Sequence, residues 1–388
     1  MRIGLSGFTF SHENKGCEAL TYSVLELLSK IYIDQEVEIV CFSDFKGLGS
    51  VPEKFSQFKY YYCPLKFKDV SFKTFRMIKS CDVILDATFG DGFSDIYFSK
   101  SVYRKAIIKI IMGISKAKYI LMPQTYGPFK DKKLEKLAGI AIRKADYVFA
   151  RDEISKVYGE KISRRKVETF TDLAFLLPFD MGEEKEEDED FGLNVSGLLY
   201  KGGFSGTNQF GLALDYKEFC YDTINYLLEN TSYRIHLIPH VTLSNDPNRP
   251  VRDSDSEACK KIKESYYEND RVILAPDFSN PVEVKNYIAQ MKFFMGARMH
   301  GTIAAFSAGV ITIPVAYSRK FKGLYDKLDY PYVLDVRKLS KDDALDTVIQ
   351  WISAPSKLIE SRNNAMVIVD EKTRQFEKKM KRIIEKKD

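Results

Sequence analysis

The feature that most limits the possible folds is a regular alternation of short apolar runs with amphipathic stretches, which continues over most of the 388 residues. Short apolar runs are typical of buried strands, and the amphipathic stretches between them are typical of helices that connect parallel strands. The pattern therefore predicts an α/β fold with mainly parallel sheets. In the first half we expect strands near 2–7, 37–42, 81–87, 118–122 and 147–150, and helices near 17–31, 101–116, 132–144 and 153–159.

An acidic run, 181–190, interrupts the alternation and cannot contribute to a core, so we interpret it as an exposed linker. The alternation then restarts, with strands expected near 191–195, 234–239, 271–274, 292–297 and 311–317, and helices near 215–229, 255–265, 282–290 and 301–308. Two α/β segments of similar length, 1–180 and 191–354, predict two Rossmann-like domains that face a cleft.

The tail, 355–388, is basic and keeps apolar residues at helical spacing. We expect a helix that packs back on the first domain. The alternative is a basic amphipathic contact with anionic lipid headgroups.

The composition indicates the cellular compartment in which the protein works. The six cysteines are scattered without a CxxC pair, which argues against a zinc site or a disulfide framework and favours a reducing cytosol. No window reaches the ~20 apolar residues of a membrane span, and the first residues lack the pattern of a signal peptide. The net charge of +5 fits an anionic substrate or an anionic membrane surface. We expect a cytoplasmic protein, with peripheral contact at the inner face of the membrane as an option and no nucleic-acid partner.

The strongest candidate site is Arg298-Met299-His300-Gly301, which follows an apolar run. A guanidinium, an imidazole and the backbone N–H groups of a helix start all attract anions. In an extended backbone, residues two apart point to the same side, so Arg298 and His300 are expected to face one ligand. The alternative is an exposed arginine and a hydrogen-bonded histidine at an ordinary strand end.

Other expected strand ends carry polar residues. Asn14 and Gly16 lie in a loop before the first helix, although Asn14 also suits a helix cap. Asp91 lies in a glycine-rich turn that could be only a turn, and Gln124 ends a strand. Arg151 stands at a helix start, where a cation does not help helix stability, so it is a candidate anion ligand or a surface ion pair.

In the second half, His240 ends a strand and Lys320 follows another. His236 fits a core position better than a site. Histidines and carboxylates near Asp253 and Asp255 raise the question of a metal, but their spacing matches no familiar ligand pattern.

Taken together, the chain resembles the polysaccharide pyruvyl transferase family over most of its length. The motifs that carry the resemblance are Asn14-x-Gly16-x-x-Ala19, Gly90 with Gly92, Gln124-x-x-Gly127-Pro128, Arg151-Asp152-Glu153-x-Ser155, Asp172-x-Ala174-Phe175, Pro239-His240 with Asn245-Asp246, Arg298-x-His300 and Gly309-x-x-x-x-Pro314-x-x-Tyr317. Two positions depart from the family pattern: Cys17 stands where the family usually has Asp, and Asp91 interrupts a glycine triplet. Both departures bear on the acceptor more than on the reaction.

The resemblance implies a glycosyltransferase-B-like fold, with the acceptor on the first domain and the donor on the second. It implies transfer of pyruvate from phosphoenolpyruvate to two hydroxyls of a sugar, free or in a lipid-linked oligosaccharide, with no cofactor or metal. His300 would be the general acid, and Arg298 and Arg151 would bind the donor anion. The other implied residues are Gly301, Thr302, Tyr317, Lys320 and His240 for the donor, and Asn14, Gly16, Glu18, Asp91 and Gln124 for the acceptor.

Two alternatives stay open. A glycosyltransferase of the same fold that uses a nucleotide sugar would also need a basic donor site in the second domain. A non-catalytic protein that binds glycans or anions would release no phosphate from any donor.

Overall fold

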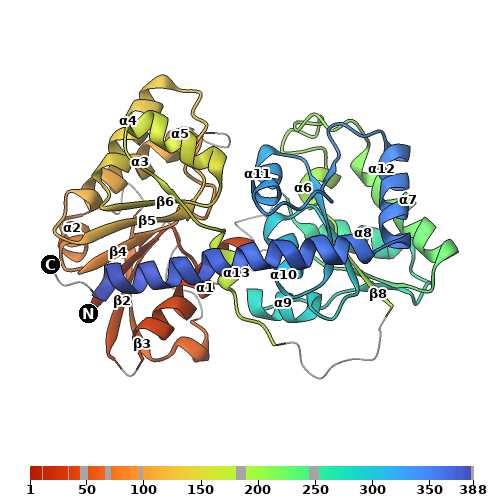
Figure 1. The fold of residues 1–388 in the computed structure, drawn as a ribbon, viewed down its shortest axis with the longest axis horizontal. Coiled ribbons are helices and arrows are strands. Elements are labelled where there is room, and N and C mark those ends of the chain that lie inside the picture. Colours follow the sequence, from red (N-terminus) through yellow and green to blue (C-terminus); the bar gives the residue numbers. More distant parts are fainter. Residues whose placement is uncertain are drawn as a thin grey trace. The chain divides into compact units, whose positions relative to one another are not determined.

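The computed structural model describes residues 1–10, 12–33, 35–43, 51–65, 71–95, 99–180, 189–243 and 253–385. Most of the acidic run (181–188) and Asn245-Asp246 lie outside these ranges. The chain divides into two compact units (Figure 1). Unit 1 comprises Met1–His12, Leu20–Leu176 and Asp370–Asp388, and unit 2 comprises Glu13–Ala19 and Leu177–Val369.

Unit 1 contains a seven-stranded parallel sheet with the strand order β3-β2-β1-β4-β5-β6-β7. Its strands are β1 (Arg2–Ser6), β2 (Val37–Ser43), β3 (Phe58–Pro64), β4 (Val83–Asp86), β5 (Lys118–Gln124), β6 (Tyr147–Ala150) and β7 (Glu168–Thr169). The five predicted strands are confirmed. The sequence pattern missed the two edge strands, β3 and β7.

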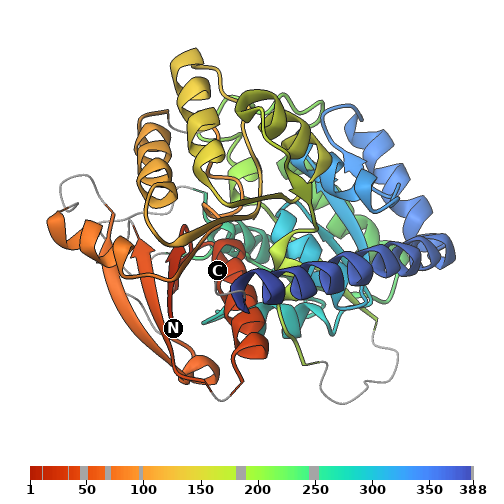
Figure 2. The same ribbon diagram turned by 60° about the vertical axis from the view of Figure 1, so that its left-hand side comes forward.

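Helices cover both faces of this sheet. They are α1 (Lys15–Ile31), α2 (Phe72–Lys79), α3 (Ser99–Gly113), α4 (Lys132–Lys144) and α5 (Glu153–Ser163). The helices α3, α4 and α5 lie side by side on one face, and α1 lies on the other (Figure 2). A buried apolar cluster fills the space between the sheet and α3 and α4, as expected for amphipathic helices that connect parallel strands.

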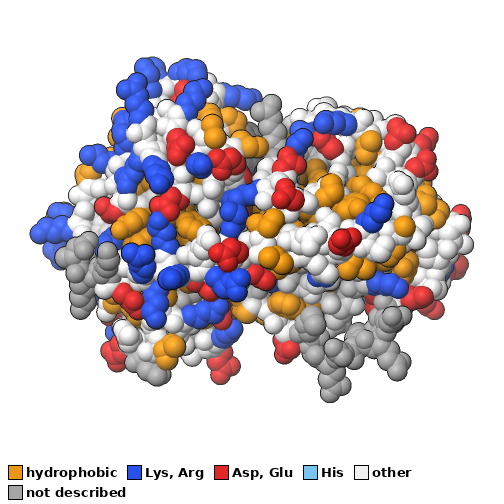
Figure 3. All heavy atoms as spheres, viewed as in Figure 1, with side chains coloured by type: hydrophobic (Ala, Val, Ile, Leu, Met, Phe, Trp, Pro, Cys, Tyr) orange, Lys and Arg blue, Asp and Glu red, His pale blue; other side chains and the backbone are white. Residues whose placement is uncertain are grey.

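The C-terminal helix α13 (Ser356–Glu385) packs on unit 1 through its last sixteen residues, as predicted. The buried ring of Phe376 lies 5.8 Å from that of Phe149 and 5.1 Å from that of Phe170. The basic side of this helix remains exposed, and Figure 3 shows Lys and Arg side chains gathered over unit 1. None of the helices in the described ranges combines the length and apolar character needed to cross a bilayer.

Unit 2 contains a six-stranded parallel sheet with the order β10-β9-β8-β11-β12-β13. Its strands are β8 (Asp190–Asn194), β9 (Arg234–Leu237), β10 (Val272–Leu274), β11 (Phe293–Gly296), β12 (Ile311–Ala316) and β13 (Leu334–Asp335). Its helices are α6 (Gly197–Tyr200), α7 (Tyr216–Asn230), α8 (Asp255–Ser265), α9 (Pro281–Ile288), α10 (Met299–Ser307), α11 (Arg319–Lys327) and α12 (Lys341–Ser353). Of these, β13, α6, α11 and α12 were not predicted.

Each sheet has a position where the chain reverses the direction in which it adds strands. This switch point lies between β1 and β4 in unit 1 and between β8 and β11 in unit 2. In open α/β sheets, ligands bind beyond the carboxyl ends of the strands at such switch points. The topology therefore gives each unit one preferred place for a ligand.

Candidate functional site

Arg298 and His300 lie beyond β11, beside the switch point of unit 2, but not on an extended strand. The strand ends at Gly296, Arg298 occupies the position before α10, and His300 belongs to the first turn of that helix. The N–H of Arg298 donates to Asn194 Oδ1 at 3.0 Å, and the C=O of Arg298 accepts from Thr302 at 3.0 Å. The prediction that strand alternation places the two side chains on one side is therefore wrong, because the helix begins two residues earlier than expected.

The guanidinium of Arg298 is held by two carboxylates. Its Nε and Nη2 contact Asp255 at 2.8–3.2 Å, and Nη2 also contacts Asp253 Oδ2 at 3.1 Å. Burial disfavours the charged guanidinium, but Asp255 and Asp253 more than offset that effect, and the pKa of Arg298 is raised. Described residues therefore bond to Nε and Nη2 of Arg298, and Nη1 is the guanidinium nitrogen to which a ligand can bond.

Replacing Asp255 by Asn is expected to lower the free energy of unfolding by about 2–3 kcal/mol, the usual value of hydrogen bonds to a charged group. Its fully buried carboxylate accepts from Arg298 and from the backbone N–H groups of Gly197, His240 and Val241. Urea denaturation measures the loss. The matched control is Asp253→Asn, whose partly exposed carboxylate should cost about 1 kcal/mol or less. Equal losses in the free energy of unfolding for the two variants would show that Asp255 does not stabilise the fold more than Asp253 does.

The segment Glu13–Ala19 belongs to unit 2 and lies against His300. The N–H of Thr242 donates to the C=O of Glu13 at 2.9 Å, and Asn14 forms a bridge with Val241. A Cβ atom added to Gly16 would lie only 2.3 Å from His300 Nδ1, so the imidazole packs directly on this glycine. The structure therefore places Asn14, Gly16 and Glu18, which we assigned to the acceptor side of the first domain, in unit 2.

Lys15 lies in the same segment as Gly16 and is a candidate site residue that the sequence pattern did not indicate. Its buried ammonium donates to Glu18 Oε2 at 3.1 Å and to the C=O of Ser279 at 2.9 Å. It is the first residue of α1, where the helix dipole disfavours a cation. The same misfit marks Arg151, so a cation at a helix start is the sequence signal that Lys15 carries.

His240 lies in the same part of unit 2, and its backbone C=O accepts from the N–H of Lys15 at 3.0 Å. Burial, and then the electrostatic effects of His300, Arg298 and Lys15, lower the pKa of His240 to about 3. The imidazole is therefore neutral near pH 7 and can take part in hydrogen bonds without adding charge. We call Lys15, Gly16, His240, Arg298 and His300 the His300 cluster.

The other predicted donor residues lie in α10, after β12 and in α11. A Cβ on Gly301 would meet His240 at 3.2 Å, so Gly301 lets the start of α10 approach that ring. Thr302 is buried and donates to the C=O of Met299 at 2.8 Å, which is a structural role. Tyr317 follows β12 and packs on Phe210, and Lys320 lies in the first turn of α11.

Arg151, Gln124 and Asp91 come together in unit 1, at the ends of neighbouring strands. Arg151 Nη1 donates to Asp172 Oδ2 at 3.0 Å, and the N–H of Arg151 donates to the C=O of Gln124 at 3.3 Å. Although burial opposes it, the carboxylates of Asp172, Asp91 and Asp152 raise the pKa of Arg151. Nη2 of Arg151 and Oε1 of Gln124 are buried with no hydrogen-bond partner among the residues that the structure describes. Such atoms need a partner, and a polar ligand can supply one.

Among the described residues, no three His, Cys, Asp or Glu side chains gather as metal ligands do. The six cysteines, all among the described residues, form no disulfide with one another.

The overall architecture is shared with several solved structures. A UDP-GlcNAc 2-epimerase from Neisseria meningitidis, bound to UDP-GlcNAc, matches with a TM-score of 0.56 and 12% identity over 97% of this chain and 100% of that chain. A sucrose-phosphate synthase from Thermosynechococcus elongatus matches with a TM-score of 0.58 and 12% identity over 99% of each chain. The Anabaena protein HepE, in complex with UDP, matches with a TM-score of 0.55 and 12% identity over 96% of this chain and 95% of that chain. These similarities confirm the predicted glycosyltransferase-B-like fold and, at such low identity, show the fold alone.

The sequence itself matches a family model. No curated protein matches the chain at a significant level. The model for polysaccharide pyruvyl transferase matches residues 14–319, a range that begins at Asn14 and contains Arg151, Arg298 and His300. The chain therefore belongs to the polysaccharide pyruvyl transferase family.

Proposed function

We propose that this transferase moves pyruvate from phosphoenolpyruvate onto two hydroxyl groups of one sugar, forming a cyclic ketal and releasing phosphate. The observation that carries the proposal is the His300 cluster. It combines a histidine in the first turn of a helix, a glycine under its ring, the buried Lys15 and the partly buried Arg298, at a switch point where ligands bind.

The chemistry requires a proton and a site for negative charge. His300, as imidazolium, protonates the methylene carbon of phosphoenolpyruvate, and the adjacent carbon becomes electrophilic. One sugar hydroxyl bonds to that carbon and gives its proton to the now neutral His300. The second hydroxyl then bonds to the same carbon as the bond to the phosphate oxygen breaks, and the phosphate leaves with the second hydroxyl's proton.

The donor's anionic groups need cationic and N–H partners. In our proposal Nη1 of Arg298, the ammonium of Lys15 and the backbone N–H groups at the start of α10 supply them in unit 2. Arg151, in unit 1, stays a proposed ligand of the donor anion, and its buried Nη2 has no hydrogen-bond partner among the described residues. The acceptor is a sugar in a glycan or a lipid-linked precursor, and the protein acts in the cytoplasm.

The donor is tested by thermal unfolding with separate additions of phosphoenolpyruvate, UDP-sugars and GDP-sugars. We expect phosphoenolpyruvate to raise the Tm of the wild-type protein and to raise that of Arg151→Lys much less, because lysine cannot present a second nitrogen at the position of Nη2. Stabilisation by a nucleotide sugar and not by phosphoenolpyruvate would support a nucleotide-sugar glycosyltransferase instead. No response of either protein to phosphoenolpyruvate would contradict the proposal.

Replacing Gly16 by Ala is expected to reduce turnover about tenfold or more with little loss of stability. The new methyl group would have to displace the His300 ring, whereas alanine favours the helical backbone of α1 by about 1 kcal/mol. Phosphate release and thermal unfolding measure the two effects. The control is Gly159→Ala in α5, where the nearest atom to an added Cβ lies at 3.3 Å and turnover should not change. Wild-type turnover in Gly16→Ala would show that catalysis does not depend on the ring position.

A further inference from the structure

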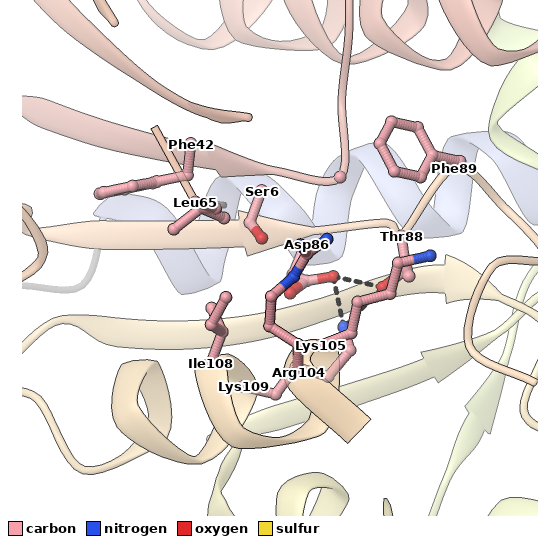
Figure 4. Close-up of a pocket in the computed structure, with 11 residues that line it drawn as sticks. Ser6, Phe42, Leu65, Asp86, Thr88, Phe89, Arg104, Lys105, Ile108 and Lys109 are labelled. Carbon is pink, nitrogen blue, oxygen red and sulfur yellow. Dashed lines mark hydrogen bonds and ion pairs between the residues drawn. The ribbon is translucent and has the colours of Figure 1, made fainter. Parts of the chain in front are cut away.

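Unit 1 has a pocket of its own at the switch point between β1 and β4 (Figure 4). It lies at the carboxyl ends of these strands, beside Ser6 and Asp86, and one side is formed by α3. None of the residues assigned above to the donor or the acceptor lines it. The lining residues are Ser6, Gly7, Phe42, Leu65, Asp86, Thr88, Phe89, Arg104, Lys105, Ile108 and Lys109.

The floor of the pocket is a buried ion pair in a hydrogen-bond network. Lys109 Nζ contacts Asp86 Oδ1 at 2.5 Å and Thr88 Oγ1 at 2.6 Å, and both side chains of the ion pair are 2% exposed. Thr88 Oγ1 donates to Asp86 Oδ1 at 2.7 Å, and the Tyr119 hydroxyl donates to Oδ2 at 2.9 Å. This network occupies both carboxylate oxygens of Asp86, and Lys109 balances the negative charge of the carboxylate. Asp86 therefore needs no ligand as a partner.

Two further cations, Arg104 and Lys105, line the pocket from α3 (Figure 4). Lys105 Nζ donates to the C=O of Gly92 at 3.1 Å and lies 5.5 Å from the centre of the Phe89 ring. With Lys109 and Asp86, the lining has three basic side chains and one acidic side chain, a net of two positive charges. The remaining wall carries the hydroxyls of Ser6 and Thr88 but is mainly apolar, which strengthens the attraction between these charges and an anion.

The turn beside the pocket is fixed in an unusual conformation. Thr88 and Phe89 have φ values of 46° and 58°, a region that residues other than glycine seldom adopt. Gly7, at φ 70°, packs so tightly on this turn that a Cβ would lie 2.4 Å from the backbone N and Cα of Thr88. Strained backbone of this kind clusters at ligand sites.

We infer that this pocket binds an oxyanion, a carboxylate or a phosphate, carried by the acceptor sugar. The net charge favours an anion over a neutral sugar ring. The free volume, about 30 Å³, holds roughly two water-sized groups, which suits two oxygens of one oxyanion while the ring remains outside. That the oxyanion belongs to the acceptor rests on the proposed function. The substrate class is then an acidic glycan, one with a uronate or a phosphorylated sugar.

The test is equilibrium binding by calorimetry with the full chain, using galacturonate, galactose 6-phosphate, galactose and phosphoenolpyruvate as separate ligands. We expect at least one acidic sugar to bind about tenfold or more tightly than galactose. Lys105→Gln should weaken that binding about tenfold and leave the affinity for phosphoenolpyruvate unchanged. The matched control is Lys116→Gln, which removes an exposed positive charge just beyond α3 and should bind as the wild type does. Unchanged Tm values would show that both variants are folded.

Four outcomes would overturn the inference. Two concern the wild type: equal affinity for galactose and the acidic sugars, and no binding of any of these sugars. Two concern the variants: equal effects of Lys105→Gln and Lys116→Gln, and a parallel loss of phosphoenolpyruvate binding in Lys105→Gln, which would assign the pocket to the donor. Binding is measured without turnover. A failure of pyruvyl transfer would therefore appear separately, as an absence of phosphate release.

Discussion

Replacing His300 by Gln is expected to reduce phosphate release from phosphoenolpyruvate by about 100-fold to 10,000-fold, the usual contribution of a positioned general acid. Glutamine retains polarity and approximate size but cannot deliver a proton to the methylene carbon. His300 is only partly buried and lies in the first turn of α10, so the free energy of unfolding should change by about 1 kcal/mol or less. Initial rates at saturating donor and urea denaturation measure the two quantities.

His236→Gln is the matched control for this prediction. His236 lies on β9 of the same sheet, and its ring contacts Tyr287 at 2.6 Å and Asp190 at 3.1 Å. Its replacement should lower stability because the buried Asp190 and the partly buried Tyr287 lose their hydrogen bonds, while the turnover of the folded protein should remain near that of the wild type. If His300→Gln retained turnover within about threefold, His300 would not be the acid.

Replacing Lys109 by Met is expected to lower the free energy of unfolding by about 3–5 kcal/mol, the usual cost of leaving one partner of a buried ion pair alone. The carboxylate of Asp86 would keep its bonds to Thr88 and Tyr119 but lose its only charged partner among the described contacts. Burial lowers the pKa of Lys109 and the Asp86 carboxylate raises it, with burial the larger effect. The charged form of Lys109 is therefore stabilised by Asp86 in turn. Urea denaturation measures the loss.

The double variant Asp86→Asn/Lys109→Met tests the cause. Removing both charges should recover a large part of the lost stability, because no unpaired buried charge remains. Lys105→Met, on the same helix but bonded to a backbone carbonyl, should cost about 1 kcal/mol or less. A Lys109→Met variant as stable as Lys105→Met would show that the ion pair contributes little.

The sequence predicted the central strands and most of the helices because the buried strands are continuous apolar runs. It missed β3, whose Lys59 is exposed and whose tyrosines are only partly buried, because an edge strand need not be apolar on both faces. It also placed the start of α10 too late. Arg298 precedes this helix without a side-chain capping bond, so the usual Ser, Thr, Asp or Asn signal is missing.

The site was predictable in its residues but less so in its arrangement. His300 and Arg298 stood out because they follow a strand. That Gly16 supports the His300 ring could not be foreseen, because the bridge between Asn14 and Val241 joins segments far apart in sequence. Lys109 also escaped notice, since a lysine in an amphipathic helix normally faces water and is buried here through a carboxylate on another element.

The most direct test of the central claim is incubation of the protein with phosphoenolpyruvate and a panel of acceptors ending in galactose, mannose or N-acetylhexosamine, each with and without an acidic group. Phosphate release and product mass are followed together. The account predicts that phosphate release depends on an acceptor and that the product gains the mass of pyruvic acid less one water, as a ketal requires. Transfer of a hexose from a nucleotide sugar by the same protein, with no phosphate release from phosphoenolpyruvate across the panel, would contradict it.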